Sequence, residues 1–270
     1  MRLRTKLLAF DLDGTTLRGD KSFSQHNRRA LQKTADSGVI LVPATGRPAH
    51  GLVGSLIDLV GIRYAIGANG AYVLDLQTGN LLHEDNIPLQ TAVEAAERLA
   101  APGVYLYAHV EGRRLRSPDP ERRFGSFFPK VEFPEPEGPL SLAELLLREE
   151  KPVQKIGVFT SDQETYRKVL EEGMCLTGLV MNSTGSLNVE FNSETASKGA
   201  ALERLCRILG VPREATLAIG DNQNDCALFR FAGYSVAMDN AIDELKQLAD
   251  EITLSNDDDG VAVFLEKHWS

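Results

Sequence analysis

Short hydrophobic runs recur near both ends of the chain, and polar or glycine residues stop each run. Leu7–Phe10 and Val39–Val42 have the length of buried strands. Between them, apolar residues from Asn27 to Ser37 recur at helical spacing, and Pro48 suits the first turn of a helix reaching about Leu59. Further helices are expected at 198–209, 224–231, 241–248 and 260–267, and further strands at 216–219, 234–237 and 252–254. Buried strands that alternate with helices predict an α/β fold with a doubly wound, mostly parallel sheet.

The middle of the chain follows a different pattern. Three short apolar runs before Glu84 are separated by turn residues such as Asn69-Gly70, which predicts hairpins. Beyond them, helices are expected at 89–101 and 163–172, and strands at 104–110, 154–160, 179–182 and 187–191. Residues 117–139 form an irregular stretch that holds six of the twelve prolines. We therefore expect a Rossmann-like catalytic core made of residues 1–84 and 188–270, with a mixed α+β cap domain, residues 85–187, inserted between them.

Composition and charge narrow the function classes. The 270 residues are 43% hydrophobic and carry a formal net charge of −9, which is typical of an ordinary globular protein. A surface for nucleic acid or anionic lipid needs a basic patch, so neither partner is expected. No apolar stretch reaches the length of a membrane span, and the N-terminal run is too short for a signal peptide, so we expect a cytoplasmic protein. The three cysteines match no zinc spacing and are expected to be reduced thiols.

Four polar segments follow expected strands or begin expected helices. They are residues 11–15 (DLDGT), 44–47 (ATGR), 197–199 (SKG) and 220–225 (GDNQND). Open parallel sheets bind ligands beyond the carboxyl ends of their strands, so these segments are expected to meet there. Together they supply carboxylates, a hydroxyl and an ammonium group, which suit a hard divalent cation with a phosphate beside it.

Phosphoryl transfer is the chemistry expected of such a site. A phosphoryl group carries about −1.5 to −2 charge, which repels a carboxylate unless a metal neutralises it. Mg²⁺ prefers oxygen ligands, and Asp11 and Asp221 would supply them. Asp11 would form an aspartyl-phosphate, while Asp13 would protonate the leaving oxygen and later activate water. The phosphoryl oxygens are expected to be held by the backbone N–H groups of Leu12 and Gly46, the Thr45 hydroxyl and the Lys198 ammonium.

These segments carry a family resemblance. In the same order, DLDGT, the threonine of ATGR, Lys198 and GDNQND resemble the four motifs of the haloacid dehalogenase (HAD) superfamily of phosphatases. Residues 69–71 (NGA), 197–202 (SKGAAL) and 259–262 (DGVA) are similar to its Cof-like branch, which has an inserted cap of the C2, or IIB, type. The stretch before Lys198, residues 191–197, lacks the proline and glycine usual in that branch.

The resemblance implies residue roles. It makes Asp11 the nucleophile and, with Asp221, a ligand of Mg²⁺. It implies that Asp13 is the acid/base and also places its backbone carbonyl on the metal. Thr45, Lys198 and Asn224 bind the phosphate in this interpretation, and Asp225 supports Lys198 or a metal-bound water.

Each of these residues alone also has a structural explanation. Thr45 can cap a helix, and Lys198 can begin one in solvent. The DLDGT segment could also be a calcium-binding loop. This interpretation is poor, because an EF-hand needs Asp or Asn and then Gly at the positions of Thr15 and Thr16. Four such segments in the right order favour catalysis over these separate explanations.

Other functions use related chemistry. A signalling receiver domain is shorter and has no GDNQND-like segment after its lysine. A P-type pump has lysine at the position of Asp13 and needs membrane spans, and a phosphate sensor without catalysis would lack a required residue. A sugar phosphomutase on the same scaffold is the main alternative to hydrolysis.

The expected cap carries an arginine-rich segment followed by the proline-rich stretch. The arginines are Arg113, Arg114, Arg116, Arg122 and Arg123, and either a solvated face or a contact with an acidic substrate group explains them. Tyr105, Tyr107 and His109 alternate along the preceding strand. We expect the cap to close over small phosphate esters: sugar phosphates first, then nucleotide-like or cofactor phosphates such as flavin precursors or pyridoxal phosphate. The expected assembly is a monomer or a small homo-oligomer.

Overall fold

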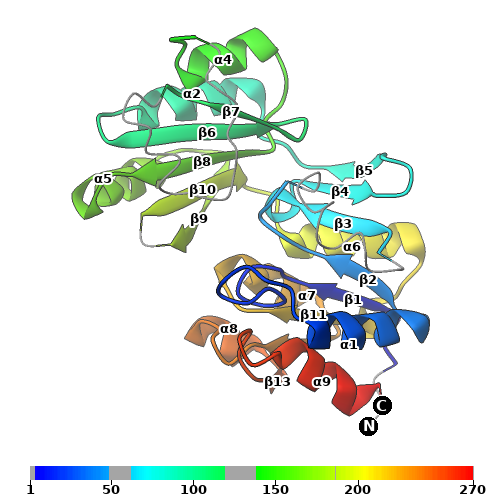
Figure 1. Ribbon diagram of the computed structural model, residues 1–270. Coiled ribbons are helices and arrows are strands. Elements are labelled where there is room, and N and C mark those ends of the chain that lie inside the picture. Colours follow the sequence, from blue (N-terminus) through cyan, green and yellow to red (C-terminus); the bar gives the residue numbers. More distant parts are fainter. Residues whose placement is uncertain (1–3, 49–61, 119–137, 186, 270) are drawn as a thin grey trace. The chain divides into compact units, whose positions relative to one another are not determined.

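The computed structural model describes residues 4–48, 62–118, 138–185 and 187–269. The chain divides into two compact units, each with its own hydrophobic core (Figure 1). Unit 1 combines Met1–Glu84 with Ser197–Ser270, and unit 2 is Asp85–Ala196. Most of the helix expected after Pro48, and the two arginines Arg122 and Arg123, lie outside the described residues.

Unit 1 is built on a five-stranded parallel sheet in the order β13-β12-β11-β1-β2. Its strands are β1 (Leu7–Phe10), β2 (Ile40–Pro43), β11 (Thr216–Gly220), β12 (Tyr234–Ala237) and β13 (Glu251–Ile252). All four residues of β1 are buried, because helices cover both faces of a parallel sheet. The chain passes from β1 to β2 on one side and later returns to β11 on the other. The carboxyl ends of β1 and β11 therefore border the crevice where such sheets bind ligands.

Helices lie on both sides of this sheet (Figure 1). They are α1 (Gln25–Asp36), α6 (Lys198–Leu209), α7 (Cys226–Phe231), α8 (Asp243–Leu248) and α9 (Gly260–His268), with short 3₁₀ turns η3 (Arg213–Ala215) and η4 (Gln223–Asp225). α1 packs against α9, while α7 packs against α6 and α8. The predicted α/β class with a parallel core sheet is confirmed.

A second, three-stranded antiparallel sheet belongs to unit 1. It consists of β3 (Tyr64–Gly67), β4 (Tyr72–Asp75) and β5 (Leu81–Glu84), as the expected hairpins indicated. A 3₁₀ turn, η2 (Ala68–Gly70), connects β3 to β4. A bridge between Ala44 and Ile66 joins this sheet to the end of β2, so η2 is held near the loop that follows β2.

Unit 2 is a five-stranded antiparallel sheet in the order β7-β6-β8-β10-β9. Its strands are β6 (Val104–Val110), β7 (Arg113–Arg116), β8 (Lys155–Thr160), β9 (Leu179–Gly185) and β10 (Asn188–Ser193). Its helices are α2 (Leu89–Leu99), α4 (Leu142–Glu149) and α5 (Gln163–Gly173), and α2 packs against the other two. Leu106, Ala108 and Val110 join the apolar core, and the alternate residues Tyr107 and His109 point to the opposite face of the sheet.

Unit 2 differs from the expected domain boundary, and it shows where the first arginines of the cap lie. Residues 188–196 were placed in the core, but β10 pairs with β8 and β9 and therefore belongs to unit 2. A short apolar run does not reveal which sheet it will join. The first three arginines of the arginine-rich segment lie in the edge strand β7, in which Arg113 pairs with Glu149 and Arg114 Nε lies 3.3 Å from His109 Nε2.

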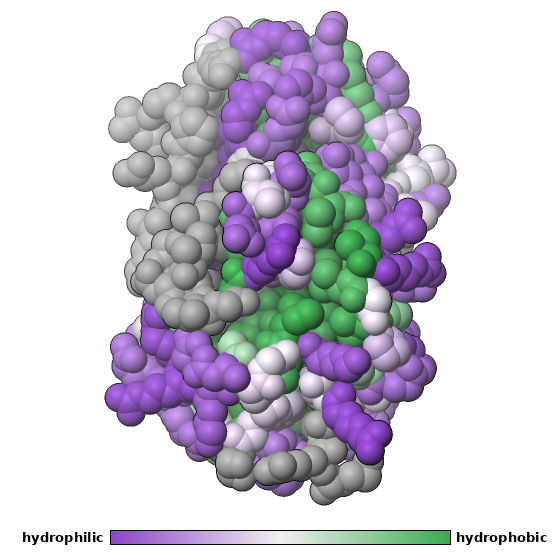
Figure 2. Space-filling view, turned by 90° about the vertical axis from the view of Figure 1, so that its right-hand side faces the viewer, coloured by the Kyte–Doolittle hydropathy of each residue, from purple (hydrophilic) through white to green (hydrophobic). Residues whose placement is uncertain are grey.

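The surface is mixed in character. Figure 2 shows one face on which both hydrophobic and hydrophilic residues are exposed. Exposed large hydrophobic residues among the described ranges include Leu81, Ile208 and Leu254, and single exposed residues of this kind are normal. None of the helices in the described ranges combines the length and hydrophobicity needed to span a bilayer.

Candidate active site

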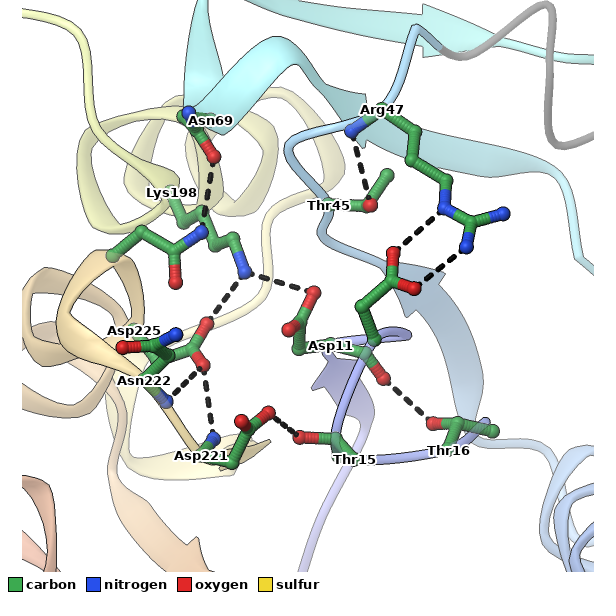
Figure 3. Close-up of polar contacts among 12 residues, drawn as sticks. Asp11, Thr15, Thr16, Thr45, Arg47, Asn69, Lys198, Asp221, Asn222 and Asp225 are labelled. Atoms are coloured by element: carbon green, nitrogen blue, oxygen red, sulfur yellow. Dashed lines mark hydrogen bonds and ion pairs between the residues drawn. The ribbon is translucent and has the colours of Figure 1, made fainter. Parts of the chain in front are cut away.

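Asp11, the residue directly after β1, is 4% exposed, and its side chain faces Lys198 (Figure 3). Lys198 is the first residue of α6, and its fully buried Nζ lies 2.9 Å from Asp11 Oδ1 and 2.6 Å from Asp225 Oδ1. Ser197 begins this helix by accepting a hydrogen bond from the N–H of Ala200. The helix start therefore fixes the lysine between two carboxylates.

The loop after β11 presents Asp221 beside the DLDGT loop. Thr15 Oγ1 donates to Asp221 Oδ1 at 2.6 Å. A Cβ at Gly14 would lie 2.4 Å from Asp221 Oδ2, so only glycine allows this approach. Asp225 Oδ2 accepts from the backbone N–H groups of Asp221 and Asn222, at 3.0 and 3.1 Å. Both oxygens of Asp225 are thus engaged in holding the loop and the lysine.

Asp13 occupies a different position from the other acidic residues. Its Oδ1 lies 2.6 Å from Arg47 Nη2, and its Oδ2 lies 2.6 Å from Arg47 Nε. Lys21 Nζ also donates to Asp13 Oδ1, at 2.9 Å. The guanidinium of Arg47 therefore contacts both oxygens of this carboxylate. In this structure the expected acid/base is therefore engaged by two cations.

The loop after β2 brings Thr45 and Gly46 to the same end of the sheet. Thr45 is buried, and its backbone N–H donates to the carbonyl of Ile66 at 3.0 Å. Its hydroxyl accepts from the N–H of Arg47 at 3.1 Å, which leaves the hydroxyl proton to donate to another group. Leu12, the other expected backbone donor, is buried between Asp11 and Asp13. The hydrogen bonds expected from Leu12 and Gly46 to a phosphate stay predictions.

Asn224 lies in η4, between Asp221 and Asp225. Its Nδ2 donates to Oδ1 of Asn69, which belongs to η2, at 3.0 Å. The four sequence segments therefore meet at one end of the core sheet, and η2 joins them as a fifth.

The charges of this site perturb one another. Burial raises the pKa of Asp11 well above its usual value, although the charge of Lys198 lowers it. Burial, together with the charge of Asp225, raises the pKa of Asp221 to about 7. Burial lowers the pKa of Lys198, but Asp11 and Asp225 outweigh it and raise that pKa overall, so the lysine keeps its charge. Crowded carboxylates of this kind are stabilised by further positive charge.

The donor set fits a hard cation. Among the described residues, one oxygen from each of Asp11, Asp221 and Asp225 lies within 4.8 Å of the others. All these donors are oxygen, which is what Mg²⁺ prefers. Because both oxygens of Asp225 already accept hydrogen bonds, Asp11 and Asp221 are better placed as ligands. The carboxylate of Asp13 is not in this cluster, and a contribution from its backbone carbonyl stays a prediction.

Sequence reasoning missed some of the contacts at this site. Arg47 was noted only as the last residue of the ATGR segment. Nothing in the sequence indicated that it would pair with Asp13, which lies 34 residues earlier. Asn69 was noted only as a turn residue and within the family-like NGA segment. Its positive φ of 59° is a conformation for which Asn is favoured, but the sequence alone does not reveal it.

Comparison with known proteins identifies the class. The family model of haloacid dehalogenase-like hydrolases matches residues 8–265, so the chain belongs to this family. It is a phosphatase of the Cof-like branch, with the subclass IIB architecture.

Three individual proteins illustrate the relationship. Phosphatase YwpJ of Bacillus subtilis (strain 168) is 33% identical over 282 residues, which cover 95% of this chain and 97% of YwpJ. The 5-amino-6-(5-phospho-D-ribitylamino)uracil phosphatase YwtE of the same organism is 29% identical, with 97% of each chain covered. The solved HAD subclass IIB sugar phosphatase BT4131 has a TM-score of 0.83, with 97% of this chain and 98% of that chain covered. At 24% identity, this last likeness shows the fold. The curated relatives favour hydrolysis over the phosphomutase alternative.

Proposed function

We propose that this chain is a Mg²⁺-dependent phosphatase that hydrolyses small phosphate monoesters through an aspartyl-phosphate on Asp11. The observation that carries the proposal is the buried Asp11 carboxylate at the end of β1, with Lys198 Nζ 2.9 Å from one of its oxygens. A buried carboxylate held beside a fixed cation is well placed to attack an anionic phosphoryl group.

The chain's own residues have separate tasks in the first step. When bound by Asp11 and Asp221, Mg²⁺ supplies positive charge that offsets the repulsion between carboxylate and phosphate. An oxygen of Asp11 attacks phosphorus, the bond to the ester oxygen breaks, and the phosphoryl group remains on Asp11. Lys198 and the Thr45 hydroxyl hold phosphoryl oxygens as charge shifts during transfer.

Asp13 handles the protons. It donates a proton to the departing alkoxide and then accepts one from the water that hydrolyses the aspartyl-phosphate. This cycle returns both carboxylates to their starting state. The contact of Asp13 with Arg47 must loosen for the first of these proton transfers, because an ionised carboxylate has no proton to give.

The proposed substrates are small metabolites. YwtE is named for 5-amino-6-(5-phospho-D-ribitylamino)uracil, and BT4131 is described as a sugar phosphatase. We therefore propose sugar phosphates and phosphorylated ribityl compounds as the first substrates to assay.

Phosphate release from a panel of such esters, with and without Mg²⁺, tests the proposal. Asp11→Asn is expected to lower kcat/KM by at least about 1000-fold, because the nucleophile is lost. Asp36→Asn, at an exposed residue of α1, is the matched control and should leave activity unchanged. Acid quenching should trap a phosphoprotein in the wild type and none in Asp11→Asn. Undiminished activity in Asp11→Asn would refute the mechanism.

A further inference from the structure

The η2 turn contacts the loops of the site although it belongs to none of the four motifs. We propose that Asn69, in this turn, is a positioning residue that orients the amide of Asn224 so that one N–H faces the phosphoryl group. The inference rests on the proposed phosphatase function and deepens it. It is carried by the backbone of η2, by the side chain of Asn69, and by the surroundings of Asn224.

The backbone of η2 has an unusual conformation that its neighbours hold in place. Ala68 and Asn69 have φ values of 48° and 59°, and this left-handed region costs a residue with a Cβ roughly 1–2 kcal/mol. The N–H of Ala68 donates to the carbonyl of Arg47, and the N–H of Asn69 donates to the carbonyl of Thr45, both at 3.0 Å. The turn is thereby fixed to the phosphate-binding loop after β2.

This anchoring directs the Asn69 side chain across the site (Figure 3). Asn69 is 2% exposed, and its Oδ1 lies 3.0 Å from Asn224 Nδ2. An oxygen at this place accepts a hydrogen bond only from the nitrogen end of the Asn224 amide. A flipped amide would bring two oxygens together, so Asn69 selects one of two orientations.

The surroundings of Asn224 indicate that its amide would not adopt this orientation without Asn69. Asn224 Oδ1 is buried and makes no hydrogen bond within the described residues. A buried acceptor without a partner costs about 1–3 kcal/mol, so the local environment alone does not favour this orientation. An amide nitrogen carries two N–H groups, and Asn69 accepts one of those of Nδ2. In our proposal the other donates to a phosphoryl oxygen.

Asparagine combines two properties at position 69. It tolerates the left-handed backbone, and it supplies the acceptor oxygen. These properties can be separated by mutation, because Asn69→Gly keeps the backbone conformation accessible and removes only the side chain. Asn69→Ser, whose side chain is too short to reach Asn224, is a second variant in case the glycine variant does not fold.

The experiment is a double-mutant cycle of Asn69→Gly and Asn224→Ala. Steady-state kinetics gives kcat and KM on the best phosphate ester, and competitive inhibition gives Ki for inorganic phosphate. Asn69→Gly is expected to raise KM and Ki by about tenfold, equivalent to one lost hydrogen bond, with kcat changed by less than about threefold. In the Asn224→Ala background, Asn69→Gly should have no further effect, because the amide that it orients is already absent.

Asn80→Gly is the matched control, since Asn80 is an exposed residue in the hairpin of the same three-stranded sheet. It should keep wild-type KM and Ki. Additive losses in the double variant, or wild-type values in Asn69→Gly or Asn69→Ser, would overturn the inference while leaving the proposed function intact. Absence of Mg²⁺-dependent phosphate release by the wild type would overturn the proposed function and, with it, the inference.

Discussion

At the scale of single residues, the environment of Asp13 suits its proposed role as a base but not its proposed role as an acid. Burial raises the pKa of Asp13, but the hydrogen bonds and charges of Arg47 and Lys21 outweigh it and hold the pKa below its usual value. A carboxylate in this state accepts a proton from water, but it is ionised when a leaving group needs one. We therefore infer that Arg47 controls the acid half of the reaction.

Removing Arg47 should change the pH profile in a defined direction. In Arg47→Ala the pKa of Asp13 rises, because its strongest donor is lost. The protonated form of Asp13 then persists to higher pH. For an alkyl phosphate, the alkaline limb of the plot of kcat/KM against pH should therefore shift to higher pH. For 4-nitrophenyl phosphate, whose leaving group needs no proton from an acid, the alkaline limb should lie at the same pH in Arg47→Ala and in the wild type.

Arg63→Ala is the control for this experiment, since Arg63 forms a similar ion pair with Asp75, outside the site. Its profile should match the wild type. An unchanged alkaline limb in Arg47→Ala on the alkyl phosphate would contradict the role given to Arg47.

The sequence predicted residues that lie inside short motifs better than residues that act across segments. Asp11 and Asp221 were found because each follows a buried strand, and the carboxyl ends of parallel strands meet. The contact between Arg47 and Asp13 joins residues 34 positions apart, and that between Asn224 and Asn69 joins residues 155 apart. Such pairs depend on backbone angles and packing that no local pattern encodes.

At the scale of elements, periodicity located most strands and helices of unit 1, while partners were harder to assign. Strand β10 was expected near its observed place but was assigned to the wrong unit. Helix α4 was not expected, although Ser141 and Glu144 form a capping box at its start. This signal lies directly after the proline-rich stretch, whose composition favours irregular structure. The sequence also did not predict which elements pack closely against each other, such as η2 against α6.

That packing leads to a prediction at Gly70. A Cβ at Gly70 would lie 2.1 Å from the carbonyl oxygen of Ser197 and 2.7 Å from the backbone nitrogen of Lys198. Gly70→Ala must therefore displace the start of α6, which carries Lys198. We expect a loss of kcat/KM of at least about 100-fold, since small displacements of catalytic groups are costly, and a lower Tm.

Gly79→Ala separates this clash from backbone strain. Gly79 also has a positive φ, of 75° against 102° at Gly70, but a Cβ there meets no atom within 4 Å. It should lose about 1–2 kcal/mol of stability from the left-handed backbone and keep its kcat/KM. Equal activity losses in the two variants would show that the contact between η2 and α6 does not position Lys198.

At the scale of the whole molecule, the acidic cluster links stability, pH and metal binding. The pKa of Asp221 is raised from 3.8 to about 7. The stability associated with this group is therefore fully present below pH 3.8 and is lost as the pH rises through 7. Without a metal, the folded protein holds a proton here that the unfolded chain would release. A bound cation must displace this proton.

The increase in Tm caused by Mg²⁺ should accordingly grow as the pH rises. Between about pH 5 and 7, affinity is expected to increase by up to about tenfold per pH unit, because metal and proton compete for Asp221, and it should level off above pH 7. Thermal unfolding at several pH values, with and without Mg²⁺, measures this without relying on activity. The pH dependence should be weaker in Asp221→Asn, where Asp11 is the remaining proposed ligand with a raised pKa, and it should keep its full size in the exposed control Asp36→Asn. A Mg²⁺-induced increase in Tm that is equal at pH 5 and pH 7.5, or a pH dependence of that increase that is as steep in Asp221→Asn as in the wild type, would exclude Asp221 as a ligand that couples metal binding to the proton.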